Sequence, residues 1–118
     1  MRWLLVLALG AGCKNQADPP PPPETRPPPA LPASEVKRGQ DACQAYVHKV
    51  CACAETVPAM KQRCSLAHAL VDAIQVGADV AINPDSTRRD AVQSNASVRG
   101  VVKECIEQLA RLPADGCP

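Results

Sequence analysis

The segment CQAYVHKVCACAETVPAMKQRC, residues 43–64, decides the fold of this chain. It contains four of the seven cysteines and has Pro58 near its middle. A residue that precedes proline disfavours the helical conformation, whereas proline itself fits the first turn of a new helix. The segment therefore predicts two helices joined by a turn at residues 56–58.

The helix before this turn is predicted to run from about Glu35 to Glu55, with Ser34 as its N-cap. Its apolar and cysteine residues fall within an arc of roughly 160° when successive residues are placed 100° apart. The members of this face are Val36, Cys43, Tyr46, Val47, Val50, Cys51, Cys53 and Ala54. One amphipathic helix with its cysteines on the buried face is indicated.

The same periodicity predicts a second helix from Pro58 to about Val80 and a third that ends at about Leu112. Residues 83–86, Asn-Pro-Asp-Ser, are typical of a turn followed by a new helix cap. The polar residues 93–97 and the poor helix former Gly100 leave open whether the third helix is continuous or broken there. We therefore expect an all-α domain at residues 34–118, a disulfide-stapled bundle of three helices, or of four if that break occurs.

The helical faces also predict how six cysteines pair. Cys51 and Cys64 lie at similar distances from the Pro58 turn, so a bridge across the hairpin is expected. Cys53 is about 200° from Cys51 around the first helix and should face the third helix. This favours Cys53 with Cys117 and Cys43 with Cys105, one pattern among the 15 that six cysteines allow.

A metal site is the alternative use of these cysteines. Cys51, Cys53, Cys64 and His68 supply four ligands that suit zinc or copper. Cys64 and His68 are one helical turn apart and could meet at one ion, but Cys51 and Cys53 point in different directions on a continuous helix. Thiol-disulfide catalysis is disfavoured, because Cys51-x-Cys53 lies near a helix carboxyl terminus, where the helix dipole opposes a thiolate.

The amino terminus predicts export. A basic start and an apolar run at residues 3–9 precede Gly10-Ala11-Gly12-Cys13, so residues 1–12 are expected to be a signal peptide. Ala11, Gly12 and Cys13 resemble the lipobox of small bacterial envelope lipoproteins, although Leu is usual at the position of Gly10. The resemblance implies that Cys13 is lipidated and becomes the mature amino terminus. Lipidation of Cys13 would leave six cysteines of seven, an even number that can pair completely.

Residues 13–33 are predicted to be a lipidated cysteine followed by a proline-rich linker. Nine of the thirteen prolines lie between residues 14 and 33. Such a segment adopts polyproline II at about 3.1 Å per residue and could reach on the order of 60 Å. We expect it to hold the domain away from a membrane.

Composition excludes several classes of function. The net charge is +1, and the signs are mixed, so a nucleic-acid partner is not expected. No uninterrupted apolar run reaches the roughly 18 residues of a membrane-spanning helix. The sequence carries no Ser-His-Asp order, paired carboxylates or phosphate loop, so neither an enzyme nor a cofactor is predicted.

The spacing Cys43-x2-Tyr46-x4-Cys51-x-Cys53 resembles uncharacterised cysteine-rich lipoproteins, and this resemblance implies no activity. The predicted function is a lipid-anchored protein of the bacterial cell envelope that displays a helical binding or structural domain, with an envelope protein as its partner. The outer membrane is the expected location, because Lys14 stands where inner-membrane lipoproteins of enteric bacteria carry Asp. A periplasmic or secreted protein is the alternative location, and an envelope metal-binding protein is the alternative function.

Overall fold

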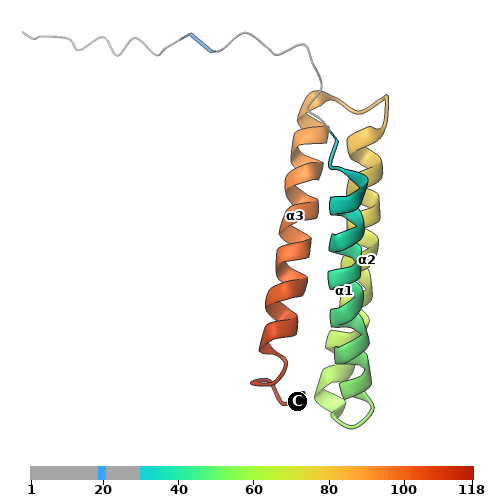
Figure 1. Cartoon of the computed structure of the whole chain (residues 1–118), viewed down its shortest axis with the longest axis vertical. Coiled ribbons are helices and arrows are strands. Elements are labelled where there is room, and N and C mark those ends of the chain that lie inside the picture. The colour runs from blue at the N-terminus through green and yellow to red at the C-terminus, as the bar shows by residue number, and fades with distance from the viewer. Residues whose placement is uncertain (1–18, 21–29) are drawn as a thin grey trace, which may run out of the picture.

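Three long helices packed side by side form the domain, as the computed structural model of the chain shows (Figure 1). The structure describes residues 19–20 and 30–118. Helix α1 spans Ala33–Ala54, α2 spans Lys61–Ile82 and α3 spans Arg88–Arg111. No strand occurs within these residues, so the predicted all-α, disulfide-stapled fold is confirmed. The predicted signal peptide, Cys13 and most of the linker lie outside the described residues.

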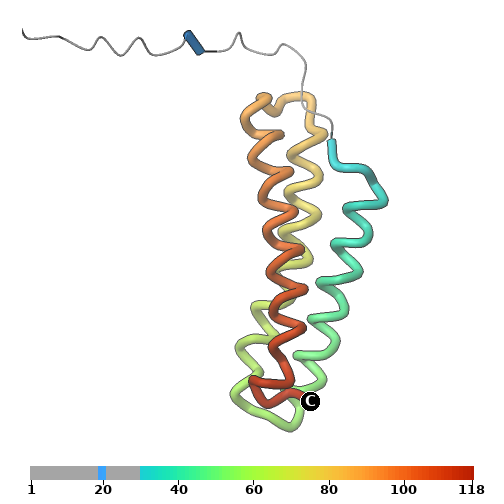
Figure 2. Tube along the Cα trace, turned by 60° about the vertical axis from the view of Figure 1, so that its left-hand side comes forward, coloured from blue at the N-terminus to red at the C-terminus, as the bar shows by residue number. Residues whose placement is uncertain are grey.

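The helices run up, down and up, so each end of the bundle collects a defined set of segments (Figure 2). The start of α1, the end of α2 and the start of α3 lie at one end. The turn between α1 and α2 and the carboxyl terminus lie at the other end (Figure 1). We call these the linker end and the carboxyl end.

Helix α1 begins earlier than predicted, and Ser34 is not its cap. Pro32 is the N-cap residue, and no side chain caps this helix. The carbonyl oxygen of Pro32 accepts the backbone N–H groups of Glu35 at 2.9 Å and Val36 at 3.1 Å. The fixed φ of proline suits the N-cap position, so the helix starts after Pro32 and Ser34 lies inside the first turn.

The turn after α1 has the predicted form with one refinement. Pro58–Met60 form a short 3₁₀ helix, η1, and α2 follows directly. By average hydropathy, one segment of 25 described residues, Pro58–Ile82, is long and apolar enough to cross a membrane. In this fold the segment contributes Met60, Ala67 and Ile74 to the core and packs against α1 and α3, as expected of a bundle helix.

Helix α3 is continuous, so of the two alternatives left open by residues 93–97 and Gly100 the structure has the three-helix bundle. A Cβ atom at Gly100 would meet nothing within 4 Å, so this glycine lies on the open face of the helix. Ala91, Val98 and Cys105 are buried along the other face. Their packing outweighs the helix-propensity cost of Gly100, about 1 kcal/mol.

Thr87, the residue after the predicted turn at 83–86, caps α3. Its hydroxyl accepts the backbone N–H of Asp90 at 3.1 Å, and the Asp90 carboxylate accepts the backbone N–H of Thr87 at 2.9 Å. This reciprocal capping box satisfies two donors that the start of a helix otherwise leaves open. The hydrogen bonds from Thr87 lower the pKa of the Asp90 carboxyl.

The core is a narrow column between the three helices, built from small and medium side chains. Its largest fully buried side chains are Ile74, Leu112, Val50, Cys43, Cys105 and Cys117. Two glycines let the helices approach closely, because a Cβ atom at Gly39 would lie 2.5 Å from Val102 Cγ2, and one at Gly77 would lie 2.6 Å from Val98 Cγ2. The valines of α3 therefore occupy the space that side chains on α1 and α2 would otherwise fill.

Candidate functional site

Three disulfides join the helices, and they are the pairs that the helical faces favoured. Cys51 is bonded to Cys64 across the α1–α2 hairpin. Cys43 is bonded to Cys105 and Cys53 to Cys117, so two bridges tie α1 to α3 and to the segment that follows it. Every cysteine within the described residues is therefore in a disulfide.

A cysteine–histidine cluster lies at the hairpin bridge, towards the carboxyl end. The Sγ atom of Cys51 is 3.7 Å from Nε2 of His68. The potential ligand atoms of Cys51, Cys64 and His68 all lie within 4.8 Å of one another. Three of the four residues of the predicted alternative metal set are thus brought together.

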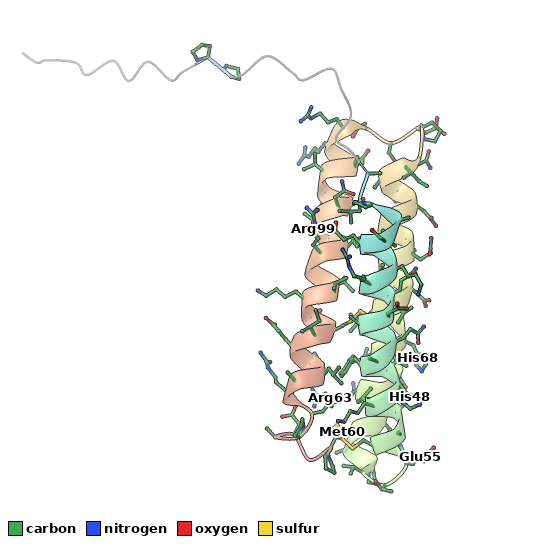
Figure 3. The ribbon with its side chains drawn as sticks, viewed as in Figure 1. His48, Glu55, Met60, Arg63, His68 and Arg99 are labelled. Atoms are coloured by element: carbon green, nitrogen blue, oxygen red, sulfur yellow. A yellow bond between two sulfur atoms is a disulfide. The ribbon has the colours of Figure 1, made fainter. Side chains whose placement is uncertain are left out.

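Cys53, the fourth residue of that set, is not part of the cluster. It is bonded to Cys117, which is fully buried beneath the carboxyl-terminal turn. The separation follows from helix geometry, because residues two apart point about 200° apart. His48 is exposed on α1, one turn before Cys51, and Figure 3 shows it on the same side of the bundle as His68. It does not belong to the group of converging ligand atoms.

Arg63 fixes the carboxyl-terminal segment next to the cluster. Its guanidinium donates to the Asp115 carboxylate at 2.8 Å and to the Gln108 side-chain carbonyl at 2.6 Å. The hydrogen bond to Asp115 is the main cause of a raised pKa for Arg63, and the Tyr46 hydroxyl also contributes. Figure 3 shows Arg63 near Met60 at this end of the bundle. Arg63 thereby connects α2 with α3 and with the turn before Cys117.

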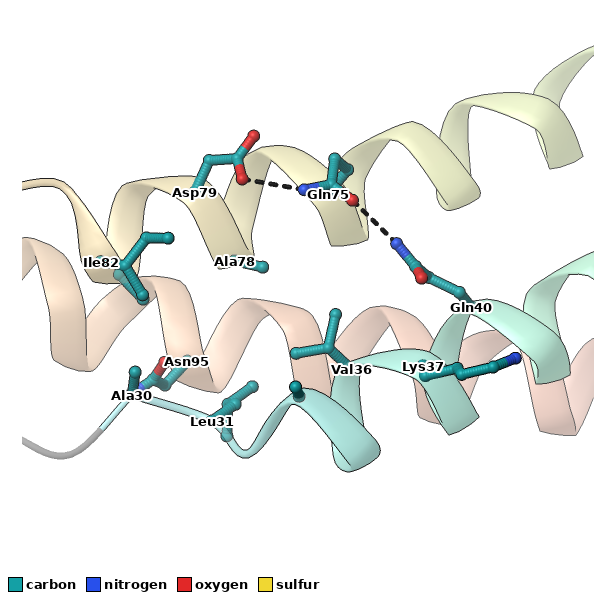
Figure 4. A pocket seen from close by; sticks show the side chains of 12 residues that line it. Ala30, Leu31, Val36, Lys37, Gln40, Gln75, Ala78, Asp79, Ile82 and Asn95 are labelled. Atoms are coloured by element: carbon teal, nitrogen blue, oxygen red, sulfur yellow. Dashed lines mark hydrogen bonds between the residues drawn. The ribbon is translucent and has the colours of Figure 1, made fainter.

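A cavity of about 260 Å³ lies at the linker end, where the chain enters α1. Leu31 lines it from the segment before α1, Val36 lines it from α1, and Ala78 and Ile82 line it from α2 (Figure 4). A short polar row borders one side. Gln40 donates to the Gln75 carbonyl oxygen at 2.9 Å, and Gln75 donates to Asp79 at 2.8 Å (Figure 4).

An ion pair closes the same end of the bundle between α1 and α3. Arg99 Nε donates to Glu35 Oε1 at 2.8 Å. This hydrogen bond lowers the pKa of the Glu35 carboxyl and raises the pKa of Arg99. Arg99 also borders a neighbouring hollow with Leu31 and Pro32, so residues 30–32 are held between the two helices.

The sequence interpretation missed the Arg63 contacts and the cavity. Both depend on residues that meet only after the helices pack: Arg63 is 52 residues from Asp115, and the cavity combines all three helices with residues 30 and 31. A local signal did exist for the cap of α3, since Thr87-Arg88-Arg89-Asp90 has the spacing of a capping box.

No known protein family, curated protein or solved structure matches the chain. A functional hypothesis therefore depends on the residues and their geometry.

Proposed function

We propose that the chain is a lipid-anchored protein of the bacterial cell envelope and that its cross-linked helical domain acts by binding. The observation that carries the proposal is the use of the cysteines. The sequence has seven cysteines, and the three disulfides use six of them. Cys13 is left for the lipid, in a sequence that resembles a lipobox.

The disulfides also support export. Bridges that hold a small domain together persist in oxidising compartments and are rare where thiols are kept reduced. This domain has a narrow core without phenylalanine, so it depends on covalent cross-links more than a larger domain does. A signal peptide at residues 1–12 would deliver it to such a compartment.

The arrangement of the bundle supports display of a binding domain. A tether from Cys13 enters the domain through residues 30–32, at the linker end. Cys51 lies 18 residues along α1 from Ala33, about 27 Å away at 1.5 Å per residue. The linker end would then face the membrane, and the carboxyl end would face away from it. The cavity at the linker end, lined largely by apolar residues of α1, α2 and residues 30 and 31, could receive an apolar side chain of an envelope partner.

The anchor is tested by the mass of protein purified from membranes of a bacterial host. Wild-type protein should lack residues 1–12 and carry a diacylglyceryl or triacyl adduct at Cys13. A Cys13→Ser variant should carry no lipid and leave the membrane fraction. Wild-type protein that keeps Met1 and carries no lipid would refute the anchor.

The binding role is tested by filling the cavity. A photo-crosslinking residue at position 40 should capture one envelope protein reproducibly in the wild-type background. Ala78→Leu, which places a larger side chain in the cavity, should abolish that crosslink, whereas Ala73→Leu on the exposed face of the same helix should leave it intact. Equal crosslinking in both variants would show that the cavity does not bind the partner.

A further inference from the structure

We infer that Cys51, Cys64 and His68 form a redox-controlled site for a thiophilic divalent cation of the zinc class. When the disulfide is closed, its sulfurs are bonded to each other and cannot act as thiolate ligands. When the bridge is reduced, two thiolates and one imidazole face a common point. This inference concerns the carboxyl end of the bundle and is independent of the proposed lipid anchor.

The distances fit a tetrahedral ion. With Zn–S near 2.3 Å and Zn–N near 2.0–2.1 Å, tetrahedral angles place a ligand sulfur and a ligand nitrogen about 3.6 Å apart. Cys51 Sγ and His68 Nε2 are 3.7 Å apart. The imidazole nitrogen is therefore already at ligand distance, and the movement required on metal binding is mainly the separation of the two sulfurs.

The positions of the three residues are set by separate elements. Cys51 is on α1, and Cys64 and His68 are on α2, four residues apart and hence on one face of that helix. The two α-carbons of the bridge are 4.7 Å apart. The other two disulfides continue to hold α1 to α3 and its following segment when this bridge opens.

The hairpin bridge is also the most accessible of the three disulfides. Cys51 and Cys64 are both partly exposed, whereas Cys43, Cys105 and Cys117 have no exposed surface. Each of the other bridges therefore includes at least one fully buried cysteine. A soluble dithiol would reach Cys51–Cys64 first.

The chemistry balances with a dithiol as the reductant. A thiolate of the dithiol attacks one sulfur of the bridge, and the other cysteine leaves as a thiolate. The second thiol of the reductant then attacks the mixed disulfide, so the protein gains two electrons and two protons while the dithiol becomes a disulfide. Binding of the divalent cation displaces the two thiol protons, and the neutral His68 nitrogen donates its lone pair. The fourth position of this Cys₂His set would be left to solvent.

The experiment uses the full chain carrying Cys13→Ser, so that no seventh sulfur competes. The protein is treated with a limiting amount of dithiol, separated from it without air, and titrated with Co²⁺ as a spectroscopic probe, then with Zn²⁺. We expect peptide mapping to show that Cys51 and Cys64 are reduced first. The reduced protein should develop a thiolate-to-cobalt charge-transfer band that Zn²⁺ removes, and the oxidised protein should develop none.

His68→Gln tests the assignment, with His48→Gln as the matched control on the neighbouring helix. We expect His68→Gln to weaken Co²⁺ binding at least about tenfold and His48→Gln to change it less than twofold. Helicity is followed by circular dichroism in each sample. The inference is overturned if selective reduction produces no cobalt band, if another bridge opens first, or if binding is the same in His68→Gln as in the parent. Cobalt binding only after loss of helicity would overturn it as well, because the site requires the folded hairpin.

Discussion

At the scale of single residues, Arg63 links α2 to α3 and to the carboxyl-terminal segment. Its guanidinium donates to Asp115 and Gln108, and it also contacts the buried Met60 sulfur and the Tyr46 hydroxyl. A charged hydrogen bond contributes more than a neutral one when its partners are partly shielded from water. Arg63 is only 29% exposed, so its contacts should matter more than those of the surface pairs on the same domain.

Replacing Arg63 with methionine should therefore destabilise the domain. Arg63→Met keeps the apolar stem but removes both donors, and we expect the free energy of unfolding to fall by about 1–2 kcal/mol. Urea denaturation followed by circular dichroism measures the change. Arg99→Met, which breaks the more exposed pair with Glu35, is the control and should have a smaller effect. A larger loss of stability in Arg99→Met than in Arg63→Met would mean that Arg63 does not hold the carboxyl-terminal segment.

We expect the Glu35–Arg99 pair to account for part of the loss of domain stability at acidic pH. Arg99 lowers the pKa of Glu35 below its ordinary value of 4.5. A carboxyl whose pKa is lower in the folded state binds fewer protons there than in the unfolded state. It contributes stability that is present above the ordinary value and is lost as the pH falls through the folded value.

Glu35→Gln should therefore flatten the fall in stability below about pH 4.5. Thermal unfolding between pH 7 and pH 2 measures the slope. Asp90 loses its own contribution over a neighbouring acidic range, because Thr87 lowers its pKa too, so some decline should persist in Glu35→Gln. A curve identical to that of the wild type would show that the pair is not formed in solution.

At the scale of elements, small residues decide how closely the helices pack. Gly39 on α1 and Gly77 on α2 each face a valine of α3, whereas Gly100 on α3 faces open space. Valine is stiff at χ1, so it cannot turn aside easily to admit a methyl group. The same glycine-to-alanine change should therefore have opposite effects at these positions.

Gly39→Ala and Gly77→Ala should each lower the free energy of unfolding, by up to about 2 kcal/mol. Overpacking typically costs about 1–3 kcal/mol, which exceeds the gain in helix propensity of about 1 kcal/mol. Gly100→Ala should raise it by up to about 1 kcal/mol, because the gain comes without a clash. The three midpoints of thermal unfolding provide the comparison. Stabilisation by all three would contradict the close approach at Gly39 and Gly77.

The helices were predictable because each has a long apolar stripe, and two of the three disulfides followed from the opposite directions of Cys51 and Cys53. The ends of the helices were less predictable. Ser34 looked like a cap, but the helix begins after Pro32, whose carbonyl accepts the backbone N–H groups of Glu35 and Val36. The continuity of α3 could not be decided from the sequence, because local helix propensity does not include the packing of the opposite face. The Cys51–Cys64–His68 contact needed the hairpin to close, and the spacing alone wrongly included Cys53.

At the scale of the whole molecule, the two ends of the bundle have different chemistry. The linker end holds the apolar cavity and the entry of the chain. The carboxyl end holds two disulfides, the histidine cluster and the Arg63 contacts. The Cys43–Cys105 bridge lies between these ends. Disulfides therefore join α1 to α3 and to its following segment at two positions along the bundle. The two bridges between them should then be energetically coupled.

The coupling follows from chain entropy. Each of these bridges alone would close a loop of more than 60 residues in the unfolded chain, since the sequence separations are 62 and 64. When the other bridge is present, the loop that remains to be closed is only about 24 residues, and the entropic stabilisation falls from about 4.3 to about 3.5 kcal/mol. Cys51–Cys64, with a separation of 13, contributes about 3 kcal/mol on the same scale.

Removing both α3 bridges should therefore cost more than the sum of the single removals, by about 1 kcal/mol. The double removal approaches 8 kcal/mol, which is comparable to the whole stability of a small domain, so we expect that variant to be unfolded. Paired serine substitutions at 43 and 105, at 53 and 117, and at all four positions are compared by urea denaturation. If the four-serine variant stays folded at both room and body temperature, the core and the remaining Cys51–Cys64 bridge are sufficient to hold the bundle.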